Sequence, residues 1–207
     1  MLKAKEMANA LYEIEAIQIR PDRSFVWTSG IQSPIYCDNR LTMSYPKVRK
    51  QIVEQFASLI AEMDEKPDVI AGCATAGIPH AAWLADYLDL PMVYVRSKPK
   101  GHGKGNQIEG TIQEGAKVIV IEDLISTGGS SLQSALVLQE AGAKVMGVLA
   151  IFSYGLSKAD HEFAEAQIPF RTITTFDILA EALVEKQEIT EAEKKDLLAW
   201  RDDLGKS

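Results

Sequence analysis

Short apolar runs alternate with longer amphipathic stretches over most of this chain, and this alternation restricts the possible fold more than any other feature. The runs suited to β-strands are 68–72, 91–96, 117–121, 144–152 and 169–174. Helices are expected at 2–15, 46–63, 78–87, 130–141 and 158–166, with two more amphipathic helices at the C-terminal end. Such an order predicts an α/β fold with a central, mostly parallel sheet flanked by helices. Ligands of such sheets bind at the carboxyl ends of the strands, so the loops there are the first candidates for a site.

Composition narrows the class of protein and its partners. The 207 residues are 46% hydrophobic and 25% charged, which suits one globular domain with a substantial core. A net charge of −7 argues against a nucleic-acid partner bound through overall positive charge. The two cysteines, Cys37 and Cys73, have no paired or metal-binding spacing, as is usual in a reducing compartment. Because no apolar stretch reaches membrane-spanning length, we expect a cytoplasmic protein with no membrane partner.

The segment 118–130, VIVIEDLISTGGS, carries the most specific chemistry. Four β-preferring residues are followed by Glu122 and Asp123, and then by a glycine-rich turn that opens a helix. Gly128 and Gly129 allow the backbone to approach a ligand, and the N–H groups of the helix start can bind an anion. The two acids would repel a phosphate, but they suit ribose hydroxyls or a hydrated divalent cation. The pattern therefore indicates a ligand with both a phosphate and a vicinal diol; the alternative is an ordinary turn with two surface acids.

This segment resembles the phosphoribosyl pyrophosphate (PRPP) signature of the type I phosphoribosyltransferases. It contains neither a nucleotide P-loop nor a dinucleotide-binding glycine motif. The resemblance implies that the acids bind the ribose hydroxyls and that the turn surrounds the 5-phosphate. The implied PRPP-binding residues here are Glu122, Asp123, Leu124, Ile125, Ser126, Thr127, Gly128, Gly129 and Ser130.

A basic, glycine-rich segment at 96–107 is the second informative feature. It places Arg96, Lys98, Lys100 and His102 close together in an otherwise acidic chain. Loss of pyrophosphate from an anomeric carbon leaves a leaving group that gathers negative charge, and mobile cations can stabilise that charge. His102 could also donate a proton or a hydrogen bond to the leaving oxygen. The alternative interpretation is a solvated charged loop.

The same segment resembles the catalytic loop of orotate phosphoribosyltransferases. That resemblance implies a homodimer in which the 96–104 loop reaches into the partner's site, with Lys100, His102 and Asp123 as catalytic residues. It also implies a single phosphoribosyltransferase domain, with a small N-terminal hood over about 1–42 and a core over about 43–207.

The stretch 29–40, SGIQSPIYCDNR, is similar to the hood that covers the base in this family. By this similarity Tyr36 would flank the orotate ring and Ser126 would hydrogen-bond it. Many relatives have a lysine at the position of Thr28, and some have an arginine at that of Tyr154. Because neither is present here, backbone N–H groups or Arg40 are the open alternatives for holding the orotate carboxylate.

A second turn between a strand and a helix lies at 71–77. We expect its backbone N–H groups to bind pyrophosphate, as those of the first turn are expected to bind an anion. Its binding residues would be Ala74, Thr75, Ala76 and Gly77, and we hypothesise a strained or cis non-proline peptide there. The tight connection alone is the alternative. His80, just behind this turn, is interpreted as a polar packing residue.

The expected reaction joins orotate and PRPP to give orotidine 5′-phosphate and pyrophosphate in pyrimidine synthesis. Magnesium would enter mostly on the pyrophosphate, with few direct protein ligands, and Asp123 would reach it through water. One alternative is a phosphoribosyltransferase for a purine or for uracil. Another is a PRPP-sensing regulator without catalysis, which the acidic net charge disfavours.

Overall fold

A six-stranded sheet forms the centre of the computed structural model, which describes residues 2–22, 24–26, 32–98 and 107–204. The strand order is β10-β9-β8-β5-β6-β7, and only β7 runs antiparallel to its neighbour. The strands are β5 Val69–Cys73, β6 Met92–Val95, β7 Ile108–Glu109, β8 Lys117–Ile125, β9 Lys144–Ser153 and β10 Phe170–Thr175. The expected mostly parallel sheet is therefore confirmed.

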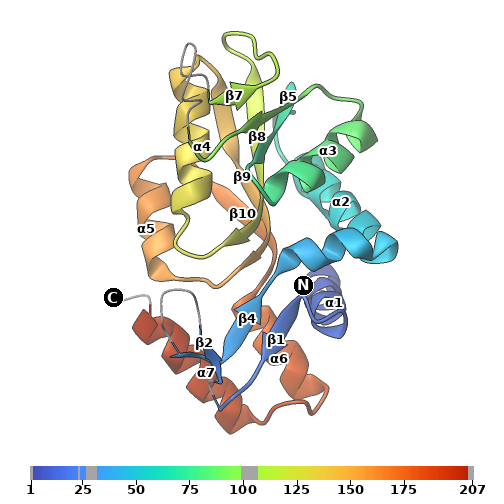
Figure 1. Ribbon diagram of the computed structural model, residues 1–207, viewed down its shortest axis with the longest axis vertical. Coiled ribbons are helices and arrows are strands. Elements are labelled where there is room, and N and C mark those ends of the chain that lie inside the picture. Colours follow the sequence, from blue (N-terminus) through green and yellow to red (C-terminus); the bar gives the residue numbers. More distant parts are fainter. Residues whose placement is uncertain (1, 23, 27–31, 99–106, 205–207) are drawn as a thin grey trace.

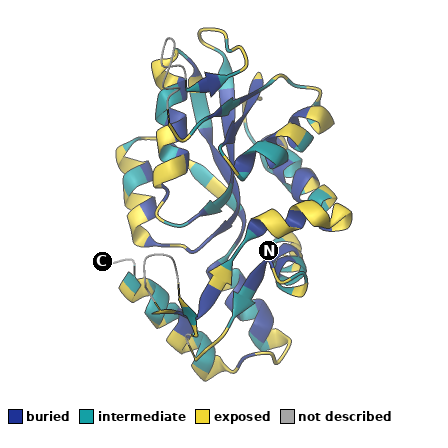
Figure 2. Cartoon of the chain, viewed as in Figure 1, coloured by how far each residue is buried: buried dark blue, intermediate teal, exposed yellow. Residues whose placement is uncertain are grey.

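Helices cover both faces of this sheet (Figure 1). The helices are α2 Pro46–Ala61 and α3 Gly77–Leu88 on one face, and α4 Gly129–Glu140 and α5 Ser157–Glu165 on the other. Side chains of β8 alternate between them: Ile119 and Ile121 join the core under α2 and α3, whereas Val118 and Val120 join the core under α4 and α5. All four are fully buried, so β8 is apolar on both faces over residues 118–121 (Figure 2).

The N-terminal segment and the C-terminal helices pack together beside the carboxyl edge of the sheet (Figure 1). The elements are α1 Leu2–Glu13, β1 Ile17–Ile19, β2 Phe25–Val26, β3 Gln32–Ser33, β4 Ile35–Cys37, the 3-10 helix η1 Asn39–Ser44, α6 Phe176–Glu185 and α7 Glu191–Leu204. One apolar cluster runs through α1, the sheet and α6 without a break. The division into a hood of about 1–42 and a core of about 43–207 therefore remains a prediction.

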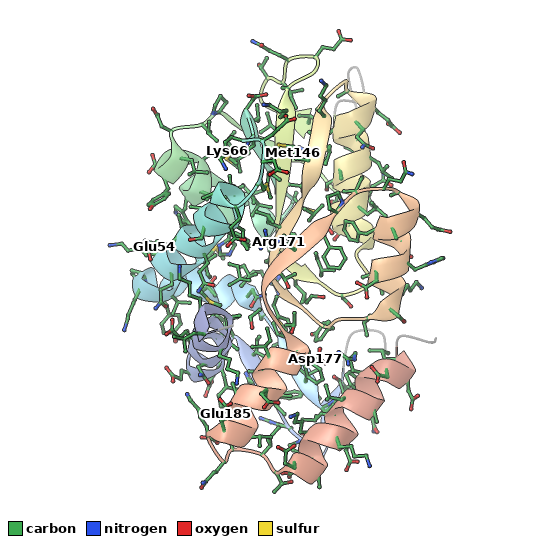
Figure 3. All side chains as sticks on the ribbon, turned by 180° about the vertical axis from the view of Figure 1, so that it is seen from behind. Glu54, Lys66, Met146, Arg171, Asp177 and Glu185 are labelled. Atoms are coloured by element: carbon green, nitrogen blue, oxygen red, sulfur yellow. The ribbon has the colours of Figure 1, made fainter. Side chains whose placement is uncertain are left out.

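Ion pairs join both ends of α6 to neighbouring helices. Figure 3 labels the two acidic residues of α6 that form them, Asp177 and Glu185. Lys5 of α1 pairs with Glu185 at 2.6 Å, and Arg201 of α7 pairs with Asp177 at 2.8 Å. The helix α7 begins with a capping box: Thr190 N donates to Glu193 Oε2 at 2.7 Å, and Glu193 N donates to Thr190 Oγ1 at 3.2 Å. Within the described ranges, no helix has the length and apolar composition required to cross a membrane.

Two strands of the central sheet differ from the prediction. The strand expected at 117–121 continues to Ile125, so Glu122 and Asp123 lie inside β8 and not in the turn. Pairing with β9 continues through Ile125 opposite Ser153, and this pairing keeps the acidic residues extended. No strand is predicted between 96 and 117, but β7 lies there, and its buried Ile108 pairs with Val95. A two-residue strand with one apolar side chain gives too short a periodic signal to be recognised in sequence.

Close packing at Gly77 sets the distance between α3 and β8. A Cβ atom at this position would lie 2.3 Å from the carbonyl oxygen of Ile121. At Gly72, a Cβ would lie 2.9 Å from Ile78 Cα. The helix can therefore approach the sheet this closely only because both positions lack a side chain.

We expect Gly77→Ala to lower the free energy of unfolding by about 2 kcal/mol or more, because the methyl group must displace the backbone of β8. Urea titration followed by circular dichroism measures the change. Gly129→Ala is the matched control, since nothing lies within 4 Å of a Cβ there. Equal stability of the two variants would contradict this account of the packing.

Candidate active site

The carboxyl end of β8 brings two acids into a largely buried position. Glu122 is only 5% exposed, and its Oε2 accepts a hydrogen bond from Ser130 Oγ at 3.2 Å. Its Oε1 accepts from the backbone N–H of Asp123 at 3.1 Å. Burial, together with the charge of Asp123, raises the pKa of Glu122 to about 8, and burial also raises the pKa of Asp123. Near neutral pH the pair therefore retains a proton, so Glu122 can donate a hydrogen bond as well as accept one.

The turn after β8 has the geometry expected of an anion site. Gly128 precedes α4 with φ of +85°, and a Cβ there would lie 2.7 Å from a ring carbon of Phe163. No side chain caps the start of α4, and Gly129 faces open space. The first N–H groups of the helix therefore remain available for a ligand, where the helix dipole favours negative charge.

The second turn, at residues 74–77, lies beside the first because their strands are neighbours. In the parallel pairing of β5 and β8, Gly72 is opposite Ile121. The peptide bond between Ala74 and Thr75 is cis, as hypothesised from the sequence. Thr75 is exposed at the tip of this turn, and Gly77 is buried against β8. The two predicted phosphate-binding turns therefore share one edge of the sheet.

The basic segment begins at the end of β6, the next strand in the sheet. Arg96 N donates to Gln107 O at 2.8 Å, and Gln107 Nε2 donates to Arg96 O at 2.9 Å, so the two ends of the segment are joined. Arg96 also pairs with Glu109 of β7 at 3.4 Å. Lys98 is exposed, whereas Lys100 and His102 lie outside the described residues.

Tyr36 of the predicted hood and Tyr154 lie close to the end of β8. Tyr36 of β4 is 41% exposed and packs against Phe25, with 5.9 Å between the ring centroids. Tyr154 is buried, and its pKa is raised first by that burial and then by the nearby charges of groups that include Tyr36 and Asp123. Tyr154 N also donates to Ile125 O at 3.2 Å, next to the predicted orotate-binding residue Ser126. Thr28 lies outside the described residues.

Asn39 connects the hood to the acidic pair, and sequence reasoning missed it. It is 1% exposed, and its Nδ2 donates to the backbone oxygen of Asp123 at 2.8 Å. Thr42 Oγ1 donates to Asn39 O at 2.6 Å and lies 3.4 Å from His80 Nε2. Burial lowers the pKa of His80 to about 4, so it is neutral near pH 7, which supports its interpretation as a packing residue. The sequence only places Asn39 after a short strand, and nothing there signals its burial.

The described part of the chain has no group of three or more His, Cys, Asp or Glu side chains arranged to hold a metal ion. Glu122 and Asp123 provide two adjacent carboxyl groups, which suits a hydrated cation held partly by its own ligand. Cys73 lies beside Glu122, but burial raises the pKa of its thiol. Its burial in the apolar core under α4 and α5 is consistent with a packing residue.

The fold and the paired turns define a phosphoribosyltransferase. The chain matches the family described as "Phosphoribosyl transferase domain" over residues 45–175. It is 60% identical to an orotate phosphoribosyltransferase of Oceanobacillus iheyensis, over 97% of this chain and 99% of that protein. The corresponding enzyme of Fusobacterium nucleatum is 56% identical, over 97% and 96% of the two chains.

A solved orotate phosphoribosyltransferase from Aeropyrum pernix is also similar, with a TM-score of 0.74 and 28% identity, over 88% of this chain and 98% of that chain. This chain belongs to the bacterial orotate phosphoribosyltransferases of the type I phosphoribosyltransferase family.

The raised pKa of Glu122 predicts a pH-dependent stability. Below about pH 4.5 the group is protonated in both the folded and the unfolded chain, so its titration does not change the free energy of unfolding. Between about pH 4.5 and 8 the unfolded chain releases this proton while the folded chain keeps it, so the free energy of unfolding falls. We therefore expect Glu122→Gln to become more stable than wild type as the pH rises, by at least about 1 kcal/mol at pH 8.

Urea titrations at pH 5 and pH 8 measure this difference. The matched control is Glu140→Gln, at the exposed end of α4. A Glu122→Gln effect that does not change with pH would show that the carboxyl group is ionised in the folded chain throughout this range.

Proposed function

We propose that this chain transfers the 5-phosphoribosyl group from PRPP to orotate, giving orotidine 5′-phosphate and pyrophosphate in pyrimidine synthesis. The observation that carries the proposal is the placement of two amide-lined turns on adjacent strands, with an acidic pair at the end of one of them. Relatives that share more than half of their residues with this chain are orotate phosphoribosyltransferases.

The proposed PRPP site divides among three segments. Glu122 and Asp123 bind the ribose hydroxyls, and the turn of Thr127 to Ser130 surrounds the 5-phosphate. The turn at 74–77 binds the pyrophosphate. The cations Arg96, Lys98, Lys100 and His102 complete the PRPP site from the basic segment, and Leu124 and Ile125 supply backbone. Tyr36 and Ser126 contact the base.

In the proposed reaction the bond between C1 of PRPP and its pyrophosphate oxygen breaks, and a bond from C1 to a ring nitrogen of orotate forms. The ring nitrogen loses its proton. Because C1 becomes cation-like, the negative charge of Asp123 stabilises the transition state from the ribose side. Lys100 and His102 stabilise the charge that collects on the departing pyrophosphate.

Magnesium is the proposed cofactor. When bound it would neutralise the pyrophosphate, and Asp123 would reach it through water. We also propose a cytoplasmic location, on the basis of the unpaired cysteines Cys37 and Cys73. The net charge of −7 supports small-molecule substrates over nucleic acid.

A homodimer with a shared 96–104 loop is the proposed assembly. Four large apolar side chains are exposed on neighbouring elements. They are Leu41 and Met43 of η1, Tyr45 just before α2, and Tyr87 of α3. Arg49 links part of this surface, because its Nη1 donates to Met43 O at 3.2 Å and its guanidinium lies 4.7 Å from the Trp83 ring centroid. An exposed apolar surface of this kind supports burial against a second copy.

We expect Lys100→Ala to reduce turnover at least about tenfold with a smaller change in PRPP affinity, because the lysine acts on the leaving group. The loss of orotate absorbance in the presence of PRPP and magnesium measures the rate. Lys144→Ala, on the exposed residue at the opposite end of the sheet, is the control. Near-normal turnover of Lys100→Ala would show that the loop takes no part in the reaction.

The same assay separates the alternative functions. Transfer to a purine or to uracil in preference to orotate would show that the chain is a phosphoribosyltransferase for another base. Tight binding of RNA or DNA in a band-shift assay without any transfer would favour the PRPP-sensing regulator.

Subunit mixing tests the shared loop. We expect Lys100→Ala and Asp123→Asn to be weakly active alone and to recover activity when their subunits are exchanged. One site of each mixed dimer then combines an intact loop with an intact acidic pair. If the loop served its own subunit, the mixed dimer would recover no more than the weighted sum of the two parents.

A further inference from the structure

Arg40 has an oriented guanidinium group with an open end. Its Nε donates to Asp38 Oδ1 at 2.6 Å, and the same oxygen accepts from the backbone N–H of Arg40 at 3.2 Å. The side chain is 62% exposed, and no other described residue hydrogen-bonds its two terminal nitrogens. Asp38 therefore fixes the direction of the group and leaves its outer edge available for a planar anion.

The position of Arg40 is set by its neighbours in the chain. The preceding residue, Asn39, hydrogen-bonds the backbone oxygen of Asp123 at 2.8 Å. Tyr36 lies on the strand β4 just before Asp38. Arg40 is close enough to Asp123 for its charge to lower the pKa of that carboxyl against the larger effect of burial. Its own pKa is raised first by the hydrogen bond to Asp38, and further by the charges of Asp123 and Tyr36. Arg40 thus lies near both the proposed ribose-binding acid Asp123 and Tyr36.

The chemistry of orotate favours a cation at this place in the site. Orotate is a pyrimidine with a carboxylate, and this anion must bind beside the acidic pair of Glu122 and Asp123. Without a nearby cation, repulsion between carboxylates would oppose binding. Tyr154 cannot supply the positive charge, because a tyrosine hydroxyl is neutral or negative and never cationic.

We propose that Arg40 binds the carboxylate of orotate through its two terminal nitrogens, oriented by Asp38, and so distinguishes orotate from uracil. The proposal deepens the proposed transfer to orotate and rests on it. Uracil lacks the carboxylate, so it cannot use this contact. A site that pairs a charged group with the substrate discriminates strongly against uracil, because uracil would leave that group unpaired.

Arg20 is the matched control within the same part of the chain. It is exposed, and its guanidinium lies 4.7 Å from the ring centroid of Phe25, which in turn packs against Tyr36. Arg20 thus has the same charge and a similar relation to the hood aromatics. It has no connection like that of Asn39 to the backbone of Asp123.

The experiment compares the binding of orotidine 5′-phosphate and uridine 5′-phosphate by titration calorimetry. The two nucleotides share phosphate, ribose and ring, and differ only in the carboxylate. We expect Arg40→Ala to weaken the binding of orotidine 5′-phosphate by roughly 10- to 100-fold. The affinity for uridine 5′-phosphate should be nearly unchanged. Arg40→Lys should recover part of the loss, because it restores charge without the planar fork. Arg20→Ala should change neither affinity.

Other outcomes overturn the assignment in distinguishable ways. Equal weakening of both nucleotides in Arg40→Ala would show a general effect on the site, and an unchanged preference would show that another group holds the carboxylate. Loss of preference in Arg20→Ala alone would assign the contact to Arg20. These results leave the proposed function standing if wild type transfers to orotate, whereas absence of transfer by wild type would overturn the proposed function itself.

Discussion

The parallel pairing of β5 with β8 is the constraint on which the active site depends. It aligns the carboxyl ends of two strands, so that the turn at 74–77 and the turn after Ile125 lie at one edge of the sheet. Gly77 allows α3 to contact the backbone of β8 at Ile121, immediately before the acidic pair. A ligand with phosphate at one end, pyrophosphate at the other and a diol between them matches this spacing of amides and acids.

Burial of the acidic pair makes the site electrostatically unfavourable without its ligand. Glu122 keeps a proton near neutral pH because α4 covers it and Asp123 lies beside it. Asn39 holds the backbone of Asp123 from the hood side, so the position of this acid depends on elements from two distant parts of the chain. Hydroxyl groups and a cation would satisfy these oxygens. Stability is thus lowered at the place where binding is required, as is common at functional sites.

The sequence predicts the sheet and the order of its elements well, because fully apolar strands such as 118–121 and amphipathic helices have strong periodic signals. The residues of both turns are also recognisable, since glycines directly after a predicted strand mark a turn into the next helix. What the sequence does not predict depends on tertiary contacts. The extension of β8 through Asp123 comes from pairing with β9, and the burial of Asn39 comes from the docking of η1 on β8. The packing of α6 and α7 beside the N-terminal strands likewise has no local signal.

The most direct test of the central claim, that β8 and its turn hold the ribose 5-phosphate of PRPP, is a crystal structure of the chain with PRPP and magnesium. The account predicts the 5-phosphate within hydrogen-bonding distance of the backbone N–H groups of Thr127 to Ser130, with the ribose hydroxyls on Glu122 and Asp123. A 5-phosphate bound at the turn of 74–77, or ribose hydroxyls remote from the acidic pair, would contradict it.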